Sequence, residues 1–285
     1  MKIGFIGLGM MGRPMAERLL ASGFDVQVHD SNAALAADFG GRWRDSPAGA
    51  ADGADILVTM LPNGDIVRTV LLAAGEALKP GAVVIDTSSS DAGGTVGLGR
   101  ELGARNVRLV DAPVSGGVPM ARDGKLTLMV GGADDDLFAA VEPLLSALGA
   151  RIVRLGPLGA GHAAKAINNC IAAAVLAVTA EGLVMGEKFG IAPETLLDVI
   201  NSSTGRSAVS ESVFRTQILP RSYAQGFALA LMAKDVDLAD RLRQRLGLDL
   251  PMVAETQRLW SAARDAMPGA DFTAYHAIVA EAAKD

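Results

Sequence analysis

The sequence predicts an α/β domain followed by an all-helical domain, and three observations support this. Short apolar runs alternate with amphipathic stretches through residues 1–155, which is typical of βαβ units and a mostly parallel sheet. A Gly/Pro cluster at residues 156–161 then interrupts the pattern. After this cluster the strand signals end and helical periodicity takes over. We therefore expect domains at residues 1–158 and 159–285.

The first domain should contain a series of short strands separated by helices. Several of the apolar runs consist almost entirely of Val, Ile and Leu, as expected for strands covered on both faces. The expected strands are Lys2–Ile6, Asp25–His29, Ile56–Met60, Ala82–Asp86, Arg108–Ala112, Leu126–Gly131 and Arg151–Leu155. Amphipathic stretches such as Met11–Ser22 and Asp136–Leu148 should form the connecting helices.

The second domain should be organised around one long helix, Ala163–Phe189. This stretch is rich in Ala, Leu and Val on almost every side, and a helix that is apolar all round is buried all round. A domain of about 125 residues would not cover such a helix alone, so we expect a homodimer or homotetramer. Further helices are expected at Pro193–Ser202, Ala208–Leu219, Ala228–Leu246, Met252–Ala266 and Thr273–Ala283.

Composition and charge exclude several classes of function. The formal net charge of −6 argues against nucleic acid as a partner, because binding to phosphates depends on Lys and Arg. The single cysteine, Cys170, rules out an intramolecular disulfide and argues against a cysteine-based zinc site. The three histidines, His29, His162 and His276, do not have the spacing of metal ligands. We therefore expect no bound metal.

The N-terminal residues and the longest apolar stretch both lead us to expect a soluble protein. Met1-Lys2 leads directly into the first strand, so we expect no signal peptide and a cytoplasmic location. The longest apolar stretch, Cys170–Met185, is short and contains Glu181. It is typical of a buried helix, and we expect no membrane partner.

A glycine-rich turn between the first strand and the first helix predicts a dinucleotide-binding, Rossmann-type domain. The GxGxxG pattern consists of Gly7, Gly9 and Gly12. Gly7 permits the tight turn, Gly9 lets the backbone approach a pyrophosphate, and Gly12 allows close packing of the helix. The helix N-terminus attracts the phosphates. The predicted cofactor-binding turn comprises Gly7, Leu8, Gly9, Met10, Met11 and Gly12. An ordinary glycine turn is the alternative.

Asp30 predicts which dinucleotide binds. It ends the second strand, where a carboxylate accepts hydrogen bonds from the adenosine ribose hydroxyls. Its charge would repel a 2′-phosphate, and Ser31-Asn32 offer no adjacent cation to receive one. NAD is therefore favoured over NADP, although Asp30 could also be a simple turn residue.

Three further segments have the composition of a reaction site. One of them, Lys234-Asp235, follows an apolar run and could equally be a solvated helix face. Residues 111–117, Asp-Ala-Pro-Val-Ser-Gly-Gly, follow a strand and offer a hydroxyl and backbone N–H donors that suit a carboxylate. Lys165, Asn168 and Asn169 lie on one face at the start of the long helix. Polar side chains are costly in so apolar a helix unless they have partners or a task. Lys165 can carry or release a proton as a general acid/base.

Together these segments resemble the 3-hydroxyisobutyrate dehydrogenase, or β-hydroxyacid dehydrogenase, family over essentially the whole chain. The matching segments are Gly-Phe-Ile-Gly-Leu-Gly-Met-Met-Gly (4–12), Met-Leu-Pro (60–62), Asp-Thr-Ser-Ser (86–89), Asp-Ala-Pro-Val-Ser-Gly-Gly (111–117), Gly-x-Gly-x-x-x-Lys-x-x-Asn-Asn (159–169) and Met-Ala-Lys-Asp (232–235). Lys125 and Pro119-Met120 depart from residues usual in the family, close to the expected substrate pocket.

The resemblance implies NAD-dependent oxidation of a small β-hydroxy acid to its semialdehyde, or the reverse, in a dimer or tetramer. It implies Lys165 as the catalytic residue. It also implies substrate binding by Ser115, Gly116, Gly117 and Asn169, and further cofactor contacts by Leu61, Pro62, Ser89 and Lys234. Two alternatives stay open. One is a non-catalytic nucleotide-binding or scaffolding protein; the other is an imine reductase, a group that usually has Asp or Tyr in place of Lys165.

Overall fold

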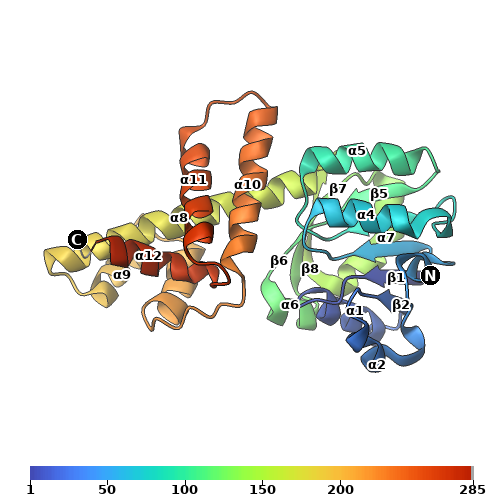
Figure 1. Ribbon diagram of the computed structural model, residues 1–285, viewed down its shortest axis with the longest axis horizontal. Helices are drawn as coiled ribbons and strands as arrows, with labels where there is room; N and C mark the ends of the chain where they lie inside the picture. The colour runs from blue at the N-terminus through green and yellow to red at the C-terminus, as the bar shows by residue number, and fades with distance from the viewer. Residues whose placement is uncertain (284–285) are drawn as a thin grey trace. The chain divides into compact units, whose positions relative to one another are not determined.

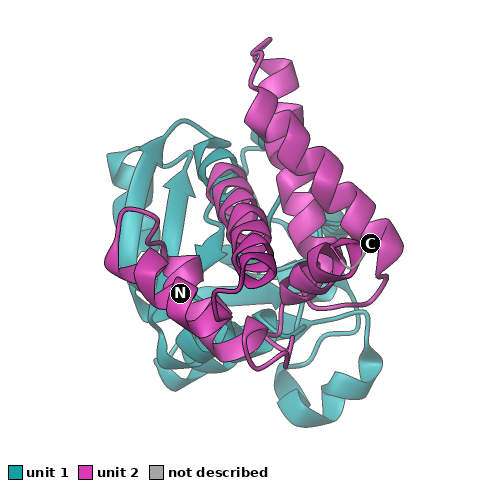
Figure 2. Ribbon diagram, turned by 90° about the vertical axis from the view of Figure 1, so that its left-hand side faces the viewer, with its two compact units in different colours: residues 1–165 teal, residues 166–285 magenta. Residues whose placement is uncertain are grey.

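The computed structural model describes residues 1–283, which form two compact units (Figure 2). Unit 1 comprises residues 1–165 and unit 2 begins at Ala166. The division falls inside a long helix, α8 (Ala160–Phe189). Sequence reasoning expected the domain boundary at 158/159, in the Gly/Pro cluster just before this helix.

Unit 1 is an α/β layer structure built on one sheet, as the sequence predicts (Figure 1). The strand order is β2-β1-β3-β4-β5-β7-β6, and β8 also pairs with β7. The strands are β1 (Lys2–Ile6), β2 (Asp25–His29), β3 (Ile56–Thr59), β4 (Val83–Asp86), β5 (Arg108–Asp111), β6 (Val114–Ser115), β7 (Leu126–Gly131) and β8 (Gly149–Gly156). The strand order reverses between β1 and β3, and ligands bind in such sheets at the carboxyl ends of the strands flanking the reversal.

The first five strands run parallel, and the sheet becomes mixed at β7. β1 to β5 pair in parallel, whereas β7 is antiparallel to β5. The two-residue strand β6 pairs antiparallel with β7 and was missed by sequence reasoning, which treated it as part of a loop. Such a short strand has too few residues to show a periodicity.

The helices of unit 1 cover both faces of the sheet (Figure 1). They are α1 (Gly12–Ala21), α2 (Ala36–Phe39), α3 (Pro47–Ala51), α4 (Gly64–Ala74), α5 (Ala92–Gly103), α6 (Gly117–Asp123) and α7 (Asp135–Leu148), with 3₁₀ turns at Ala33–Leu35, Gly40–Arg42 and Gly75–Ala77. Successive residues of a strand point to opposite faces, so Val58 joins one core cluster and Leu57 the other.

Unit 2 is entirely helical over its described residues. Its helices after α8 are α9 (Pro193–Ser202), α10 (Leu229–Arg245), α11 (Pro251–Ala266) and α12 (Tyr275–Ala282), with a 3₁₀ turn at Phe272–Ala274. The segment expected as an α-helix at 208–219 is instead a π-helix, Val209–Ile218. Trp260 anchors the core: it is fully buried, its Nε1 donates to the Ala173 carbonyl at 3.2 Å, and it stacks on Tyr275.

Helix α8 is buried on one side and exposed on the other within the single chain. Its exposed apolar side chains are Ile167, Ile171, Val178, Met185 and Phe189, whose spacings of four and seven residues place them on one face. The sequence expectation of burial all round is therefore not met within one chain. By length and composition α8 could cross a membrane, but 56% of its most apolar stretch is buried in the protein, as in a core helix.

Candidate active site

The glycine-rich turn after β1 needs glycine at two of its three positions for steric reasons. Gly7 has a φ of +101°, and a Cβ there would lie 2.2 Å from the Met60 carbonyl oxygen. A Cβ on Gly12 would lie 1.8 Å from the Gly7 carbonyl oxygen. A Cβ on Gly9, in contrast, would meet no described atom within 4 Å. The packing of the chain therefore does not require glycine at position 9. Because Gly9 has no side chain, the space above its backbone is open to a ligand.

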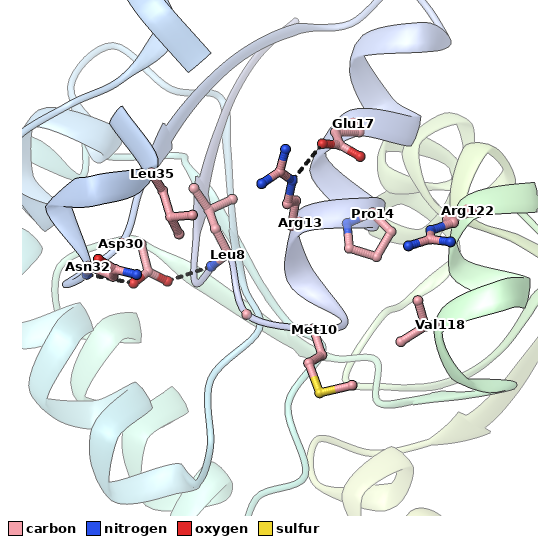
Figure 3. Close-up of a pocket in the computed structure, with 11 residues that line it drawn as sticks. Leu8, Met10, Arg13, Pro14, Glu17, Asp30, Asn32, Leu35, Val118 and Arg122 are labelled. Carbon is pink, nitrogen blue, oxygen red and sulfur yellow. Dashed lines mark hydrogen bonds and ion pairs between the residues drawn. The ribbon is translucent and has the colours of Figure 1, made fainter. Parts of the chain in front are cut away.

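A cavity of about 440 Å³ lies over this turn and is lined by four of the predicted cofactor-binding residues (Figure 3). Leu8, Gly9 and Met10 line it together with Asp30. The Leu8 backbone N–H donates to Asp30 Oδ2 at 2.6 Å, so the end of β2 and the glycine turn are bonded together. Asp30 Oδ1 accepts from the Asn32 backbone N–H at 2.8 Å, which sets the orientation of the carboxylate.

The cavity also contains charged residues that sequence reasoning did not assign. Arg13 forms ion pairs with Glu17 and Asp38, each at 2.8 Å, so its charge is already compensated. Arg122, from α6, lines the same cavity. The cavity therefore contains the carboxylates of Asp30 and Glu17, the ion-paired Arg13 and the second arginine, Arg122.

The loops after β3 and β4 are joined by a buried polar network. The Leu61 backbone N–H donates to Ser88 Oγ at 2.9 Å, and the Ser88 N–H donates to Asp86 Oδ1 at 3.0 Å. Ser88 is fully buried, whereas Pro62 is exposed and Ser89 is partly exposed. The segments predicted to contact the cofactor thus lie at the carboxyl ends of adjacent strands, where a parallel sheet binds ligands.

Asp111, the last residue of β5, holds the beginning of α8. Its Oδ1 accepts from the Gly159 N–H and its Oδ2 from the His162 N–H, both at 2.8 Å. The carboxylate therefore satisfies two backbone donors that a helix start leaves unpaired, and its charge complements the helix dipole. Lys165, which is half-buried, follows His162 after one helical turn and ends unit 1.

The predicted substrate loop begins directly after Asp111. Ser115 is partly exposed in β6, opposite Thr127 of β7. Gly116 and Gly117 are exposed and have φ values of +136° and +71°, which other residues rarely adopt. Asp111 therefore precedes this loop in the chain and also binds, through its carboxylate, the start of the helix that contains Lys165.

Asn169 and Lys234, both in unit 2, share one buried partner. Asn169 Nδ2 donates to Asp235 Oδ2 at 2.6 Å, and Lys234 Nζ lies 2.8 Å from Asp235 Oδ1. Asn168 donates to Asn169 Oδ1 at 3.1 Å. Asp235 is 2% exposed, and its hydrogen bond with Asn169 sets the orientation of the Asn169 amide. The neighbouring Cys170 thiol has a raised pKa, chiefly because of burial, which argues against a nucleophilic role.

Sequence reasoning missed three carboxylates with positioning roles: Asp86, Asp111 and Asp235. All lie in segments that it singled out as motifs, but it gave them no task. The available signal was position: Asp86 and Asp111 end apolar strands, and Asp235 interrupts the buried face of α10. Buried carboxylates require partners, so each of these positions implies a polar neighbour.

The described residues of unit 1 fit a nicotinamide dinucleotide. The open backbone at Gly9, the start of α1 and the Asp30 carboxylate offer what a pyrophosphate and an adenosine ribose require. Asp30 and the whole glycine turn lie within one unit, so this fit does not depend on unit 2.

Comparison with known proteins identifies related sequences and structures along the whole chain. Residues 2–156 match the model of the NAD binding domain of 6-phosphogluconate dehydrogenase. Residues 159–279 match the model described as NAD-binding of NADP-dependent 3-hydroxyisobutyrate dehydrogenase.

Individual relatives cover most of the chain. 2-(Hydroxymethyl)glutarate dehydrogenase of Eubacterium barkeri is 38% identical over 92% of this chain and 89% of its own length. Mitochondrial 3-hydroxyisobutyrate dehydrogenase of Mus musculus is 37% identical over 83% of this chain and 74% of its own length. The structure of Mycobacterium tuberculosis 3-hydroxyisobutyrate dehydrogenase with L-serine superimposes with a TM-score of 0.90, at 30% identity and 98% coverage of both chains.

Proposed function

Because the chain belongs to the 3-hydroxyisobutyrate dehydrogenase family of β-hydroxyacid dehydrogenases, we propose that it interconverts a small β-hydroxy acid and its semialdehyde with NAD. One observation carries this proposal: the Asp111 carboxylate joins the predicted substrate loop to the start of α8, one turn before Lys165. A cytoplasmic location and the absence of nucleic-acid and membrane partners stay predictions.

In the proposed mechanism, the protein binds the substrate carboxylate and transfers one proton to or from the substrate hydroxyl. Ser115 and the backbone N–H groups of Gly116 and Gly117 bind the substrate carboxylate. Asn169, oriented by Asp235, holds the substrate hydroxyl. Lys165 Nζ takes the hydroxyl proton during oxidation and returns it during reduction. NAD, when bound, accepts or supplies the hydride, which is the cofactor's own chemistry.

The substrate is a hydroxy acid in this proposal, and its side chain is the open question. The relatives named above act, by their names, on 3-hydroxyisobutyrate and on 2-(hydroxymethyl)glutarate. A turnover assay with NAD should include both, together with 3-hydroxypropionate, glycerate, serine and 4-hydroxybutyrate. We expect reduction of NAD with at least one of these acids. No turnover with any of them, by folded protein that binds NAD, would favour a non-catalytic nucleotide-binding protein.

The native protein should have a lower KM for NAD than for NADP. The Asp30 carboxylate would repel a 2′-phosphate, and Arg13 is already paired with Glu17 and Asp38. Arg122 also lines the cavity, so the expected preference rests on the charge of Asp30. Asp30→Ala should reduce the ratio of KM for NADP to KM for NAD by about tenfold or more. The variant should bind NAD more weakly and should no longer repel the 2′-phosphate of NADP. Asp30→Asn is the matched control for shape, because it keeps an acceptor oxygen for the Leu8 or Asn32 N–H and removes the charge. Equal or better use of NADP by the native protein would refute the assignment.

The exposed apolar face of α8 supports a homodimer or homotetramer. Val178 is 63% exposed and Met185 is 73% exposed. Large apolar faces of this kind are normally covered by a partner, here with an interface on the order of 2,000 Å². Multi-angle light scattering should therefore report two or four chains, and Val178→Glu combined with Met185→Glu should shift the mass toward one chain. An active native protein with the mass of a single chain would contradict this prediction.

A further inference from the structure

The cavity over the glycine turn contains a cation to which the proposed mechanism gives no role, Arg122. It lies in the last turn of α6, is exposed and lines the cavity. Its guanidinium forms no ion pair or hydrogen bond with another residue of the described chain. The other cation of the cavity, Arg13, is bonded to Glu17 and Asp38. Arg122 is therefore the arginine of this cavity whose N–H donors are available to a ligand.

The packing of α6 against α1 fixes the backbone from which Arg122 projects. Ala121, the residue before it, is fully buried in the same core cluster as Leu19 of α1. Gly124, which follows α6, lies against Arg18, since a Cβ on Gly124 would be 2.6 Å from Arg18 Nε. All these residues belong to unit 1. Arg122 is thus held beside the first helix without any contribution from unit 2.

The start of α1 offers backbone donors to an anion but no full positive charge. Met11 precedes the helix and its side chain makes no capping hydrogen bond, and the first turn contains no acidic residue. The backbone at Gly9 is open to a ligand. The N–H groups of a helix start and the helix dipole both favour an anion. The dipole is equivalent to about half an elementary charge, whereas each phosphate of a pyrophosphate carries a whole one.

The charges already present around the cavity favour a further cation for binding a dinucleotide. Asp30 and Glu17 line the cavity, and Asp38 is bonded to Arg13 at its edge. Arg13 by itself does not balance these three carboxylates. A pyrophosphate would add negative charge to the same region, and like charges repel more strongly where water is partly excluded. The charge of Arg122 offsets that addition.

The location of Arg122 distinguishes between the phosphates of a dinucleotide. In Figure 3, Asp30 and Asn32 lie on one side of Met10, and Arg122 lies on the other side, next to Pro14. The ribose that carries the 2′-phosphate of NADP is expected beside Asp30. The pyrophosphate is expected over the glycine turn, at the start of α1. Arg122 therefore lies toward the pyrophosphate and away from the 2′-phosphate.

We propose that Arg122 binds the pyrophosphate of the dinucleotide, as a cation supplied from outside the glycine motif. A planar guanidinium can donate two parallel hydrogen bonds to a phosphate, a stronger contact than those between neutral groups. Helix α6 then serves both ligands, because its first residue, Gly117, belongs to the predicted substrate loop. The proposal rests on the proposed binding of a dinucleotide over the glycine turn.

Isothermal titration calorimetry with ADP-ribose tests this proposal without turnover. ADP-ribose keeps the adenosine and the pyrophosphate and lacks the nicotinamide. Arg122→Gln should raise the Kd for ADP-ribose about tenfold, as loss of a hydrogen bond to a charged group does. Its Kd should also depend less on NaCl concentration than the native Kd, because one screened ionic contact is lost. Arg122→Glu should raise the Kd further by repelling the phosphates. Adenosine, measured by competition, should bind as in the native protein, because it has no phosphate.

Arg100→Gln is the matched control. Arg100 is also an exposed arginine in the last turn of a helix of unit 1, α5, and it lies outside the lining of the cavity. This variant should bind ADP-ribose with the native Kd. Circular dichroism should show native folding of both Gln variants, since both side chains are exposed.

Three results would overturn the role of Arg122. The first is native binding of ADP-ribose by Arg122→Gln. The second is weaker binding confined to 2′-phospho-ADP-ribose, which would place Arg122 at the 2′-phosphate. The third is equal weakening of adenosine and ADP-ribose, which would indicate a distorted turn. Absence of hydroxy-acid turnover by native protein that binds ADP-ribose would instead overturn the proposed function, and the comparison of Kd values would still decide the role of Arg122.

Discussion

Replacing Lys165 with Ala should lower kcat by about 10²–10⁴-fold, the usual contribution of a positioned acid/base. The ammonium is the proton carrier in the proposed mechanism, and Ala cannot substitute for it. Folding and NAD binding should be nearly unchanged, because the glycine turn and Asp30 lie elsewhere in unit 1. The measurement is kcat for the best substrate of the panel, per folded protein that binds NAD.

Two variants and one pH profile make this test specific. Lys165→Arg should not restore activity, because a guanidinium does not release its proton near neutral pH. Lys188→Ala, the same substitution at an exposed lysine of the same helix, should retain native kcat. The rate of oxidation should fall as the pH is lowered and Lys165 becomes protonated, and this limb should vanish in Lys165→Ala. If Lys165→Ala kept more than about a tenth of native kcat, Lys165 would not be the acid/base.

Replacing Gly12 with Ala should destabilise the protein by about 3 kcal/mol or more. The added Cβ would lie 1.8 Å from the Gly7 carbonyl oxygen, which is backbone and cannot move aside without distorting the turn. Gly7 is itself bonded to the His29 carbonyl, so the distortion would extend into β2. Urea unfolding monitored by circular dichroism measures the loss, and cofactor binding should weaken with it.

Gly9→Ala is the matched control. It should leave stability nearly unchanged but weaken the binding of NAD. A Cβ at position 9 meets no described atom within 4 Å, so the free energy of unfolding should stay within about 1 kcal/mol of native. The same Cβ would occupy the space through which a pyrophosphate approaches the backbone, so the Kd for NAD should rise about tenfold or more. Unchanged NAD binding in Gly9→Ala would show that the dinucleotide does not lie over this turn.

Much of the fold was predictable because its signals are local. Strands β1, β2 and β7 have the predicted bounds, and the other predicted strands differ only at their ends. The exceptions have local explanations as well. β6 is too short to show a pattern, and the π-helix at 209–218 has an apolar spacing close to that of an α-helix.

The parts of the site that depend on residue type and short spacing can be recognised from the amino-acid sequence alone. Gly7 adopts a positive φ of +101° in its own turn, and Gly12 has no room for a Cβ beside the Gly7 carbonyl. Lys165 and Asn169 share a helix face because four residues make about one turn. Each of these relations is contained in about ten residues of chain, so it can be recognised before the fold is known.

The partners of the buried charged side chains, in contrast, depend on how distant parts of the chain fold together. Asp111 binds the backbone of His162, 51 positions further along the chain, and Asn169 binds Asp235 across 66 positions. An aspartate at the end of a strand has the same local pattern whether it faces solvent or a helix start. Its partner is set by the packing of distant elements, since a buried carboxylate is stable only where that packing supplies donors. The contacts of Asp86, Asp111 and Asp235 therefore became visible only in the folded chain.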